Sequence, residues 1–259
     1  MNTSVAHPAR RYNYWLGGKD HFAADRESGD LLAKAFPTAR IAARENRDFL
    51  RRSVKFLADA GVRQFLDIGT GLPVPDNTHE IAQRVAPASR VLYVDNDPIV
   101  MTHSRALTIG TPEGRTGYVE ADLRSPEAIL EHPELRVVLD LHEPVALLLV
   151  AVLHFIHDDD QAASVVGQLL DALPPGSYLV ASNLTLDYAP PSQVAKHEEL
   201  LASGRTDARA RNKSEFSRFF QALELVEPGI VAVSDWRPDH AERPTAQDVA
   251  IYGAVGRKS

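Results

Sequence analysis

The chain has 259 residues with 44% hydrophobic and 24% charged content, which fits an ordinary globular core and argues against disorder. It contains no cysteine, so disulfides, thiolate catalysis and cysteine-bound metals are excluded. Its formal net charge of −7 repels phosphate backbones at long range, so we expect no nucleic-acid partner.

The longest apolar run spans residues 145–155 and is about half of the roughly 20 residues that a membrane helix needs. We interpret it as a buried strand. The amino-terminal sequence MNTSVAHPARRYNYW has no continuous apolar region followed by a small-residue cleavage site, so no secretory signal is predicted. We therefore expect a cytoplasmic protein with no membrane partner.

Residues 20–60 follow a helical pattern that Pro37 interrupts and Gly61 ends. We expect residues 1–60 to form a helical extension, or lid, on an α/β core that spans residues 61–259, both within one domain. Arginines recur within the extension at steps of four, three and four residues, at Arg40, Arg44, Arg47 and Arg51. On a helix they form one basic stripe, which is either a binding patch for phosphates or, as we favour, a solvated face paired with neighbouring acids.

After residue 61 the pattern changes to short apolar runs that alternate with amphipathic segments, which is typical of βαβ units around a parallel sheet. The predicted strands are residues 64–68, 90–96, 116–122, 144–153 and 177–185. The predicted helices are residues 77–85, 98–107, 126–130 and 158–173. Residues 191–223 again read as helical, and the strand-like residues 230–233 and 249–255 are close enough in the chain to predict an antiparallel hairpin at the sheet edge.

The strongest chemical signal is the sequence QFLDIGTGLP, in which an apolar strand leads into Asp67, Gly69, Thr70 and Gly71. Glycine has no Cβ, so two glycines in a turn let a ligand approach the backbone closely. The carboxyl end of such a strand is where open α/β sheets bind ligands. A dinucleotide site would carry a third glycine at position 74, which is Val74 here. This departure favours a ligand without phosphates.

Two further strands end in acidic residues near the same edge. Asp95, followed by Asn96, ends the second strand, where a carboxylate can accept both hydroxyls of a ribose. Asp122, followed by Leu123, ends the third strand, where an acid can accept from an adenine amino group. Acids at three consecutive strand ends predict a nucleoside site, although each alone is an ordinary loop residue.

These residues resemble the S-adenosylmethionine-dependent methyltransferases, whose first strand carries acid-x-Gly-x-Gly and whose second strand ends in a ribose-binding acid. The segments YNYWLGGKDHFAADRE, FLDIGTGLP, VLYVDNDPIV, ADLRSPEAIL and LLLVAVLHFIHDDD together look like an actinobacterial group of methyltransferases with unassigned substrates. The resemblance implies an α/β, Rossmann-like, mostly parallel seven-stranded sheet with helices on both faces, an antiparallel carboxyl-terminal strand, and S-adenosylmethionine as cofactor. Leu72 and Pro73 stand where such enzymes often have a third glycine, so the methionine side of the pocket is expected to differ. The implied cofactor-binding residues of the core are Asp67, Gly69, Thr70, Gly71, Asp95, Asn96, Asp122, Leu123 and Val150.

Aromatic residues near the amino terminus point to a second element of the site. Tyr12, Tyr14 and Trp15 precede Gly18 and Lys19, and aromatic faces stabilise cations such as a sulfonium. We predict that this segment closes over the cofactor as a lid, with Tyr14, Gly18 and Lys19 in contact with it. The alternative is an aromatic anchor that docks an amino-terminal arm on the core.

Methyl transfer from a sulfonium requires in-line placement of donor and acceptor, and a base is optional. His154, predicted at the end of the fourth strand, is the catalytic candidate because it can take a proton from a hydroxyl or amine acceptor. The alternative is that His154 has a structural role and is hydrogen-bonded beneath the crevice. His157 and Asp158 are residue types that can bind a metal. Their position is more typical of a helix amino terminus, where acidic residues are favourable, so no metal is predicted. His21 and Asp187 are weaker acid–base candidates.

The sequence therefore predicts methyl transfer from S-adenosylmethionine to a small-molecule acceptor. A small molecule is favoured over nucleic acid by the acidic balance and by the lack of an appended basic module. Two alternatives remain, namely a non-enzymatic S-adenosylmethionine-binding protein and, less favoured, an NAD-dependent oxidoreductase. Neither the acceptor nor the oligomeric state follows from the sequence.

Overall fold

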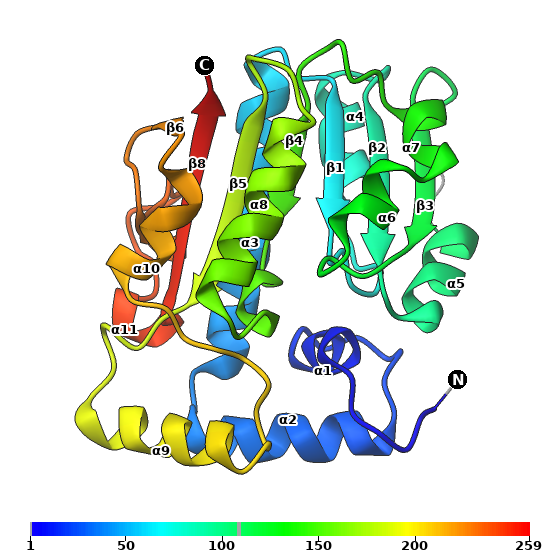
Figure 1. Ribbon diagram of the computed structural model, residues 1–259. Helices are drawn as coiled ribbons and strands as arrows, with labels where there is room; N and C mark the ends of the chain where they lie inside the picture. Colours follow the sequence, from blue (N-terminus) through cyan, green and yellow to red (C-terminus); the bar gives the residue numbers. More distant parts are fainter. Residues whose placement is uncertain (1, 108–109) are drawn as a thin grey trace.

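The computed structural model describes residues 2–107 and 110–259 and arranges helices around a central sheet (Figure 1). The helices that precede the sheet are α1 (Pro8–Trp15), α2 (Ala23–Ala35) and α3 (Ala39–Asp59). The predicted break at Pro37 is confirmed, because it lies between α2 and α3. The sequence pattern does not predict α1, which begins where the His7 side chain accepts from the Ala9 N–H and Pro8 supplies a preset φ.

The sheet runs in the order β3-β2-β1-β4-β5-β8-β6, with β7 paired to β8. Its strands are β1 (Gln64–Ile68), β2 (Arg90–Asp95), β3 (Arg115–Glu120), β4 (Ala146–Leu149), β5 (Tyr178–Leu184), β6 (Leu223–Leu225), β7 (Val231–Ala232) and β8 (Ile251–Lys258). The first five strands pair in parallel, and β8 runs antiparallel to β5, β6 and β7. The predicted mostly parallel sheet with an antiparallel carboxyl-terminal strand is confirmed. An eighth strand is present because the two-residue β7 also pairs with β8.

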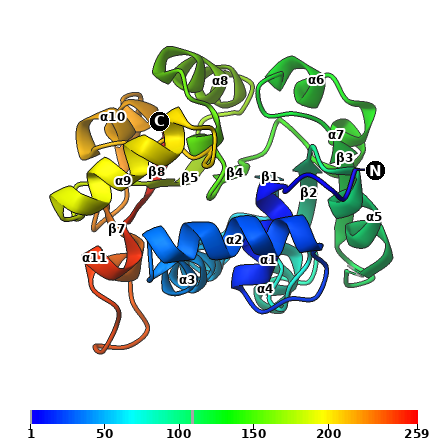
Figure 2. The ribbon, with the colours of Figure 1, turned by 90° about the horizontal axis from the view of Figure 1, so that it is seen from below.

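Two apolar cores cover the two faces of the sheet, because side chains alternate along each strand. The helices within and after the sheet are α4 (Thr78–Val85), α5 (Pro98–Leu107), α6 (Pro126–Leu130), α7 (Pro133–Val138), α8 (Asp159–Asp171), α9 (Pro191–Ala202), α10 (Lys213–Ser217) and α11 (Ala246–Val249). Leu66 and Ile68 of β1 join the core beneath α6, α7, α8 and α10, whereas Phe65 joins the core beneath α3, α4 and α11. Figure 2 shows α6 and α8 on one side of the sheet and α3 and α4 on the other.

The fourth strand is shorter than predicted. It ends at Leu149, Ala151 adopts a left-handed φ of 56°, and residues 153–155 form a 3-10 turn. The apolar run nevertheless continues, because Leu153 is fully buried in the core. A continuous apolar pattern does not separate a buried turn from a buried strand. His154 therefore lies on this turn, and its predicted place at a strand end is wrong.

The carboxyl-terminal part also differs from the prediction. The helical residues 191–223 divide into α9 and α10, with a loop over residues 203–212. The pairing of residues 230–233 with the last strand is confirmed by β7 and β8, but Val249 belongs to α11. The predicted edge position is wrong, because the short strand β6 takes the edge and β8 lies between β5 and β6.

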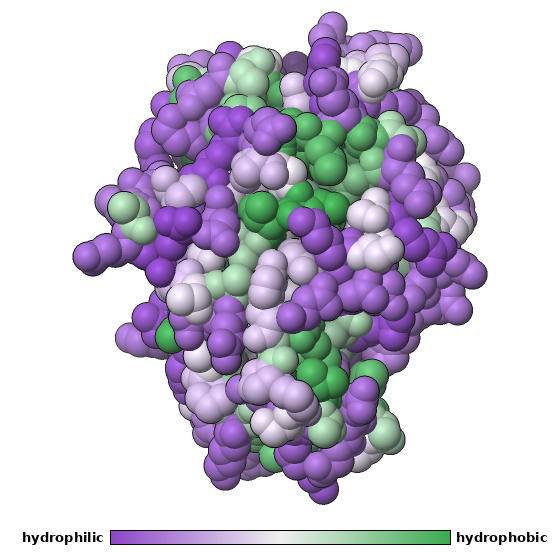
Figure 3. Space-filling view, turned by 90° about the vertical axis from the view of Figure 1, so that its left-hand side faces the viewer, coloured by the Kyte–Doolittle hydropathy of each residue, from purple (hydrophilic) through white to green (hydrophobic). Residues whose placement is uncertain are grey.

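Three helices gather at the carboxyl end of the parallel strands. In Figure 1, α1 lies directly below these strand ends, and α2 and α9 lie side by side beneath it. The side of the molecule that carries β6, α10 and α11 is mostly polar, with apolar residues gathered in its middle (Figure 3). Within the described ranges, no helix combines the length and the apolar character needed to cross a bilayer.

Candidate active site

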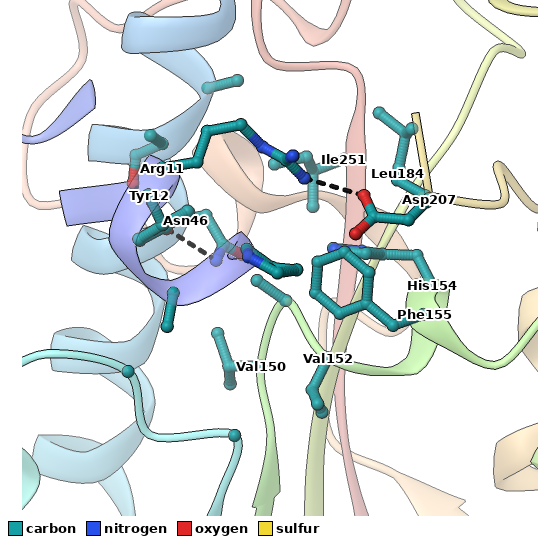
Figure 4. A pocket seen from close by; sticks show the side chains of 18 of the residues that line it. Arg11, Tyr12, Asn46, Val150, Val152, His154, Phe155, Leu184, Asp207 and Ile251 are labelled. Atoms are coloured by element: carbon teal, nitrogen blue, oxygen red, sulfur yellow. Dashed lines mark hydrogen bonds and ion pairs between the residues drawn. The ribbon is translucent and has the colours of Figure 1, made fainter. Parts of the chain in front are cut away.

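A cavity of about 820 Å³ lies at the carboxyl end of the parallel strands, with walls from α1, α2, α3 and α9 (Figure 4). The predicted site residues from the core, together with the catalytic candidate, all line it. They are Asp67, Gly69, Thr70, Gly71, Asp95, Asn96, Asp122, Leu123, Val150 and His154. Parallel pairing of β3, β2 and β1 brings their carboxyl ends, and therefore the three acids, to one wall.

The glycine turn follows β1 at this wall. Gly69 and Gly71 have φ values of 76° and 68°, a left-handed conformation that favours glycine. A Cβ on Gly69 would lie 2.5 Å from Val152, whereas a Cβ on Gly71 would meet no atom within 4 Å. Gly69 is thus required by packing. Gly71 borders open cavity, where a side chain would occupy space that a ligand can use.

The carboxylate of Asp95 is fixed in place by backbone groups. It is 5% exposed. Its oxygens accept from the Gly71 N–H and from the Asp97 N–H, both at 2.9 Å. Burial raises the pKa of Asp95. Each oxygen retains a further lone pair, so the group can also accept hydrogen bonds from a ligand in the cavity.

Asn96 and Asp122 meet at the ends of β2 and β3. The Asn96 Nδ2 donates to Asp122 Oδ2 at 3.0 Å. Arg124 donates to both oxygens of Asp122, at 2.9 and 2.5 Å, and this pairing lowers the pKa of Asp122. Asp122 is therefore a fully ionised hydrogen-bond acceptor at neutral pH.

Asp67 is a buried carboxylate beside the glycine turn. It is 5% exposed and accepts from Thr78 Oγ1 at 2.6 Å. Burial raises the pKa of Asp67 to about 6, and the charge of Arg47 on α3 acts in the opposite direction. Among the described residues, no cation lies within 4.0 Å of its oxygens. A carboxylate buried without a cation beside a cavity is suited to a cationic group of a ligand.

Helix α1 closes the cavity opposite the sheet. His7 and Arg10 each approach Asp97, which follows β2, at 3.2 Å. Arg11 pairs with Asp207 of the 203–212 loop at 2.7 Å, as Figure 4 shows. The residues of α1 that line the cavity include Pro8, Arg11, Tyr12 and Trp15. Their spacing of three and four residues places them on one side of the helix.

The structure places Tyr14, Gly18 and Lys19 outside the cavity wall. Tyr14 lies two residues from Tyr12, so it projects from the other side of α1. Its hydroxyl donates to Asp30 at 2.7 Å. The predicted aromatic contact to the cavity comes instead from Tyr12 and Trp15.

These two aromatic residues also anchor the helix. The Tyr12 hydroxyl donates to the Ala43 carbonyl at 2.8 Å, and Trp15 Nε1 donates to the Gly29 carbonyl at 3.2 Å. The arrangement therefore supports the anchored-arm alternative, with the arm itself forming part of the cavity wall. Closure of a lid stays a prediction.

His154 lies on the 3-10 turn with one ring nitrogen free. Its Nδ1 is buried and has no hydrogen-bond partner. Burial lowers the pKa of His154 to about 4, so the ring is neutral at pH 7. The turn is held by Arg211, whose guanidinium donates to the carbonyls of Leu153 and Ile156 at 2.9 and 2.6 Å. Arg211 is 1% exposed and also pairs with Asp159 at 2.9 Å.

The remaining candidates have structural partners. Asp158 caps α8 by accepting from the Gln161 N–H at 2.7 Å, which confirms its helix-terminus interpretation. His157 contacts the Asp207 carbonyl at 2.7 Å. Asp187 accepts from the Tyr252 hydroxyl at 2.9 Å. His21 packs against Tyr14 with ring centroids 5.1 Å apart. In the part of the chain that the structure describes, no three His, Asp or Glu residues are grouped to hold a metal ion.

Several residues of the wall were not identified as site residues from the sequence, and Asn46, Arg47 and His197 are among them. Asn46 and Arg47 come from α3, and His197 comes from α9. His197 is 3% exposed, and its Nε2 has no hydrogen-bond partner. The sequence signal for all three was helical periodicity, which marks them as ordinary helix residues. Arg47 departs from the predicted solvated stripe, because it faces the cavity.

The whole chain matches a single family. The model of the family described as S-adenosyl methyltransferase matches residues 1–259. The chain belongs to the S-adenosyl methyltransferase family. Its reaction is the transfer of a methyl group from S-adenosylmethionine, as predicted.

Solved structures agree with this methyltransferase assignment. A DUF574 family protein from Streptomyces avermitilis MA-4680 is 51% identical, with a TM-score of 0.94 over 99% of each chain. A candidate methyltransferase from Thermobifida fusca YX is 42% identical, with a TM-score of 0.90 over 100% of this chain and 97% of that one. The N-methyltransferase NodS from Bradyrhizobium japonicum WM9, in complex with S-adenosyl-L-homocysteine, shares the fold at 15% identity, with a TM-score of 0.50 over 96% and 98% of the two chains. No curated protein matches the chain.

Proposed function

We propose that this methyltransferase acts on a small, largely apolar acceptor that carries a hydroxyl or amine hydrogen at its reacting atom. One observation carries the proposal. Polar atoms in the cavity wall have no hydrogen-bond partner, namely Asn46 Oδ1, His154 Nδ1 and His197 Nε2. The wall around them is mainly apolar and includes Leu32, Phe36, Ala39, Ala42, Leu184 and Ile251.

The free polar atoms favour hydrogen-bond donors on the acceptor. Burial lowers the pKa of both His154 and His197, so both rings are neutral at pH 7. A neutral imidazole has one bare nitrogen that accepts a hydrogen bond, and an amide oxygen only accepts. A hydroxyl or amine satisfies such atoms, whereas a carboxylate or phosphate adds further lone pairs and leaves them unpaired.

The chemistry then divides between the ligand and the chain. S-adenosylmethionine, when bound, supplies an electrophilic methyl group on a sulfonium. His154 orients the acceptor and takes its proton at Nδ1 as the new bond forms. The apolar wall excludes water and holds the acceptor in a reactive position. Arg211 acts as a positioning residue, because it fixes the turn that carries His154.

For the cofactor, we propose that Asp95 accepts the ribose hydroxyls and that Asp122 with Asn96 binds the adenine amino group. Leu123 and Val150 supply an apolar wall for the adenine ring. Support comes from the lone pairs that Asp95 and Asp122 keep and from the open space beside Gly71. The single domain and the cytoplasmic location stay predictions from the sequence.

The acceptor class is tested by supplying methyl-labelled S-adenosylmethionine with three separate pools: metabolites below about 1 kDa, total RNA, and protein. We expect label in the metabolite pool, in molecules with a hydroxyl or amine. Ala42→Trp, which places a large side chain in the apolar wall, should abolish this labelling while S-adenosylhomocysteine still binds. Label only in RNA or protein would contradict the proposal.

A further inference from the structure

Arg47 is a guanidinium without an acidic partner in the cavity wall. It lies on α3, and its Nη2 donates to the Asp76 carbonyl at 2.7 Å. Its Nε is buried and has no hydrogen-bond partner. Among the described residues, no carboxylate lies within 4.0 Å of its nitrogens. By contrast, Arg40 pairs with Asp30, and Arg51 pairs with Asp48.

The guanidinium shares this part of the cavity with one carboxylate that also lacks an ion pair. Asp67 is that carboxylate, and the charge of Arg47 is near enough to lower its pKa. Both residues line the cavity. Two opposite charges that do not pair with each other can each pair with the opposite end of a zwitterion.

Arg47 also contacts the loop that follows the altered glycine motif. Asp76, which it contacts, ends the stretch in which Leu72 and Pro73 replace the further glycine that such enzymes often have. The side chain of Arg47 thus brings N–H donors to this loop and to the cavity that the glycine turn also lines.

We propose that Arg47 binds the carboxylate of the methionine part of the cofactor, while Asp67 faces its ammonium group. Guanidinium N–H groups match a carboxylate in geometry and form strong charge-assisted hydrogen bonds. The bound carboxylate accepts from the N–H groups that lack partners in the chain, and the buried Nε is one of them. This inference rests on the cofactor placement proposed above and is independent of the acceptor class.

The test compares two ligands by calorimetric titration. S-adenosylhomocysteine has the amino-acid end, whereas 5′-methylthioadenosine has the same nucleoside and sulfur but lacks that end. Arg47→Ala should weaken S-adenosylhomocysteine binding at least tenfold and change 5′-methylthioadenosine binding less than twofold. Arg47→Gln, which keeps a neutral donor, should show the same selectivity. Arg44→Ala, an exposed residue of the same helix, should change neither affinity.

Two results would overturn the inference. One is no loss of S-adenosylhomocysteine affinity in either Arg47 variant, and the other is an equal loss for both ligands, which is the mark of a structural role. The placement of the cofactor is tested separately by Asp95→Asn, which should weaken both ligands. If Asp95→Asn weakens neither ligand, the proposed cofactor placement fails, whatever the Arg47 variants show.

Discussion

Replacement of Asp67 by asparagine measures how much the buried, ionised carboxylate lowers the free energy of unfolding. Burial raises the pKa of Asp67 from 3.8 to about 6. One pKa unit corresponds to about 1.4 kcal/mol, so the ionised group destabilises the folded protein by ~3 kcal/mol at neutral pH. This destabilisation is absent below pH 3.8, where the carboxyl is protonated in both states. It grows as the pH rises to about 6 and is constant above that. Asparagine has nearly the same shape and can still accept from Thr78, so Asp67→Asn should raise the free energy of unfolding by up to ~3 kcal/mol.

The assay is urea unfolding of both proteins, without ligand, at three pH values of about 7.5, 6 and 5, followed by circular dichroism. The advantage of Asp67→Asn should be largest at the highest pH and should shrink on acidification, because the native carboxyl then takes up a proton. Asp171→Asn, at an exposed site, is the matched control and should show no such trend. Equal stabilities of Asp67→Asn and the natural protein at all three pH values would refute the argument from burial.

Three further outcomes follow from the site. Asp95→Ala should weaken S-adenosylhomocysteine binding by about 1.5 kcal/mol or more in calorimetry, because a charge-assisted hydrogen bond is lost. Unchanged affinity would contradict the proposal that Asp95 accepts the ribose hydroxyls. The ring of His154 should stay neutral from pH 8 to pH 5, since its pKa is about 4, and a nitrogen NMR titration with a midpoint near 6.5 would contradict this. Arg211→Met should lower the free energy of unfolding by about 3 kcal/mol, because it leaves Asp159 and the carbonyls of the turn without their buried donor. Urea unfolding checks that value, and a loss below about 1 kcal/mol would show that the turn does not depend on Arg211.

The site retains charges that do not serve the stability of the empty protein. Asp67 and Arg47 are both held at the cavity without ion pairs, and two histidines of the wall keep a buried ring nitrogen without a partner. Such groups lower stability until a ligand satisfies them. Binding of the cofactor is therefore expected to raise the melting temperature, since the ligand binds only the folded state.

Much of the cavity wall at the strand ends could be predicted from sequence, because its signals are local. A glycine turn and the acids at strand ends lie directly after apolar runs, and parallel pairing places successive strand ends together whatever the rest of the chain does. Asp67, Gly71, Asp95 and Asp122 therefore line one wall as predicted. Sequence reasoning was less exact where apolar runs leave the sheet, since the run that contains β4 continues into the turn of His154.

The other wall was decided only by tertiary structure. It is assembled from α1, α2, α3, α9 and the loop that carries Asp207, which are far apart in the chain. Helical periodicity marks Tyr12 and Tyr14 as near neighbours, but the docking of α1 on α3 determines that Tyr12 reaches the cavity and Tyr14 does not. The chain's local sequence thus specifies the wall at the strand ends, where we propose that the methyl donor binds. The opposite wall depends on long-range packing, which brings together residues such as Arg47 and His197 that carry no local signal of their own.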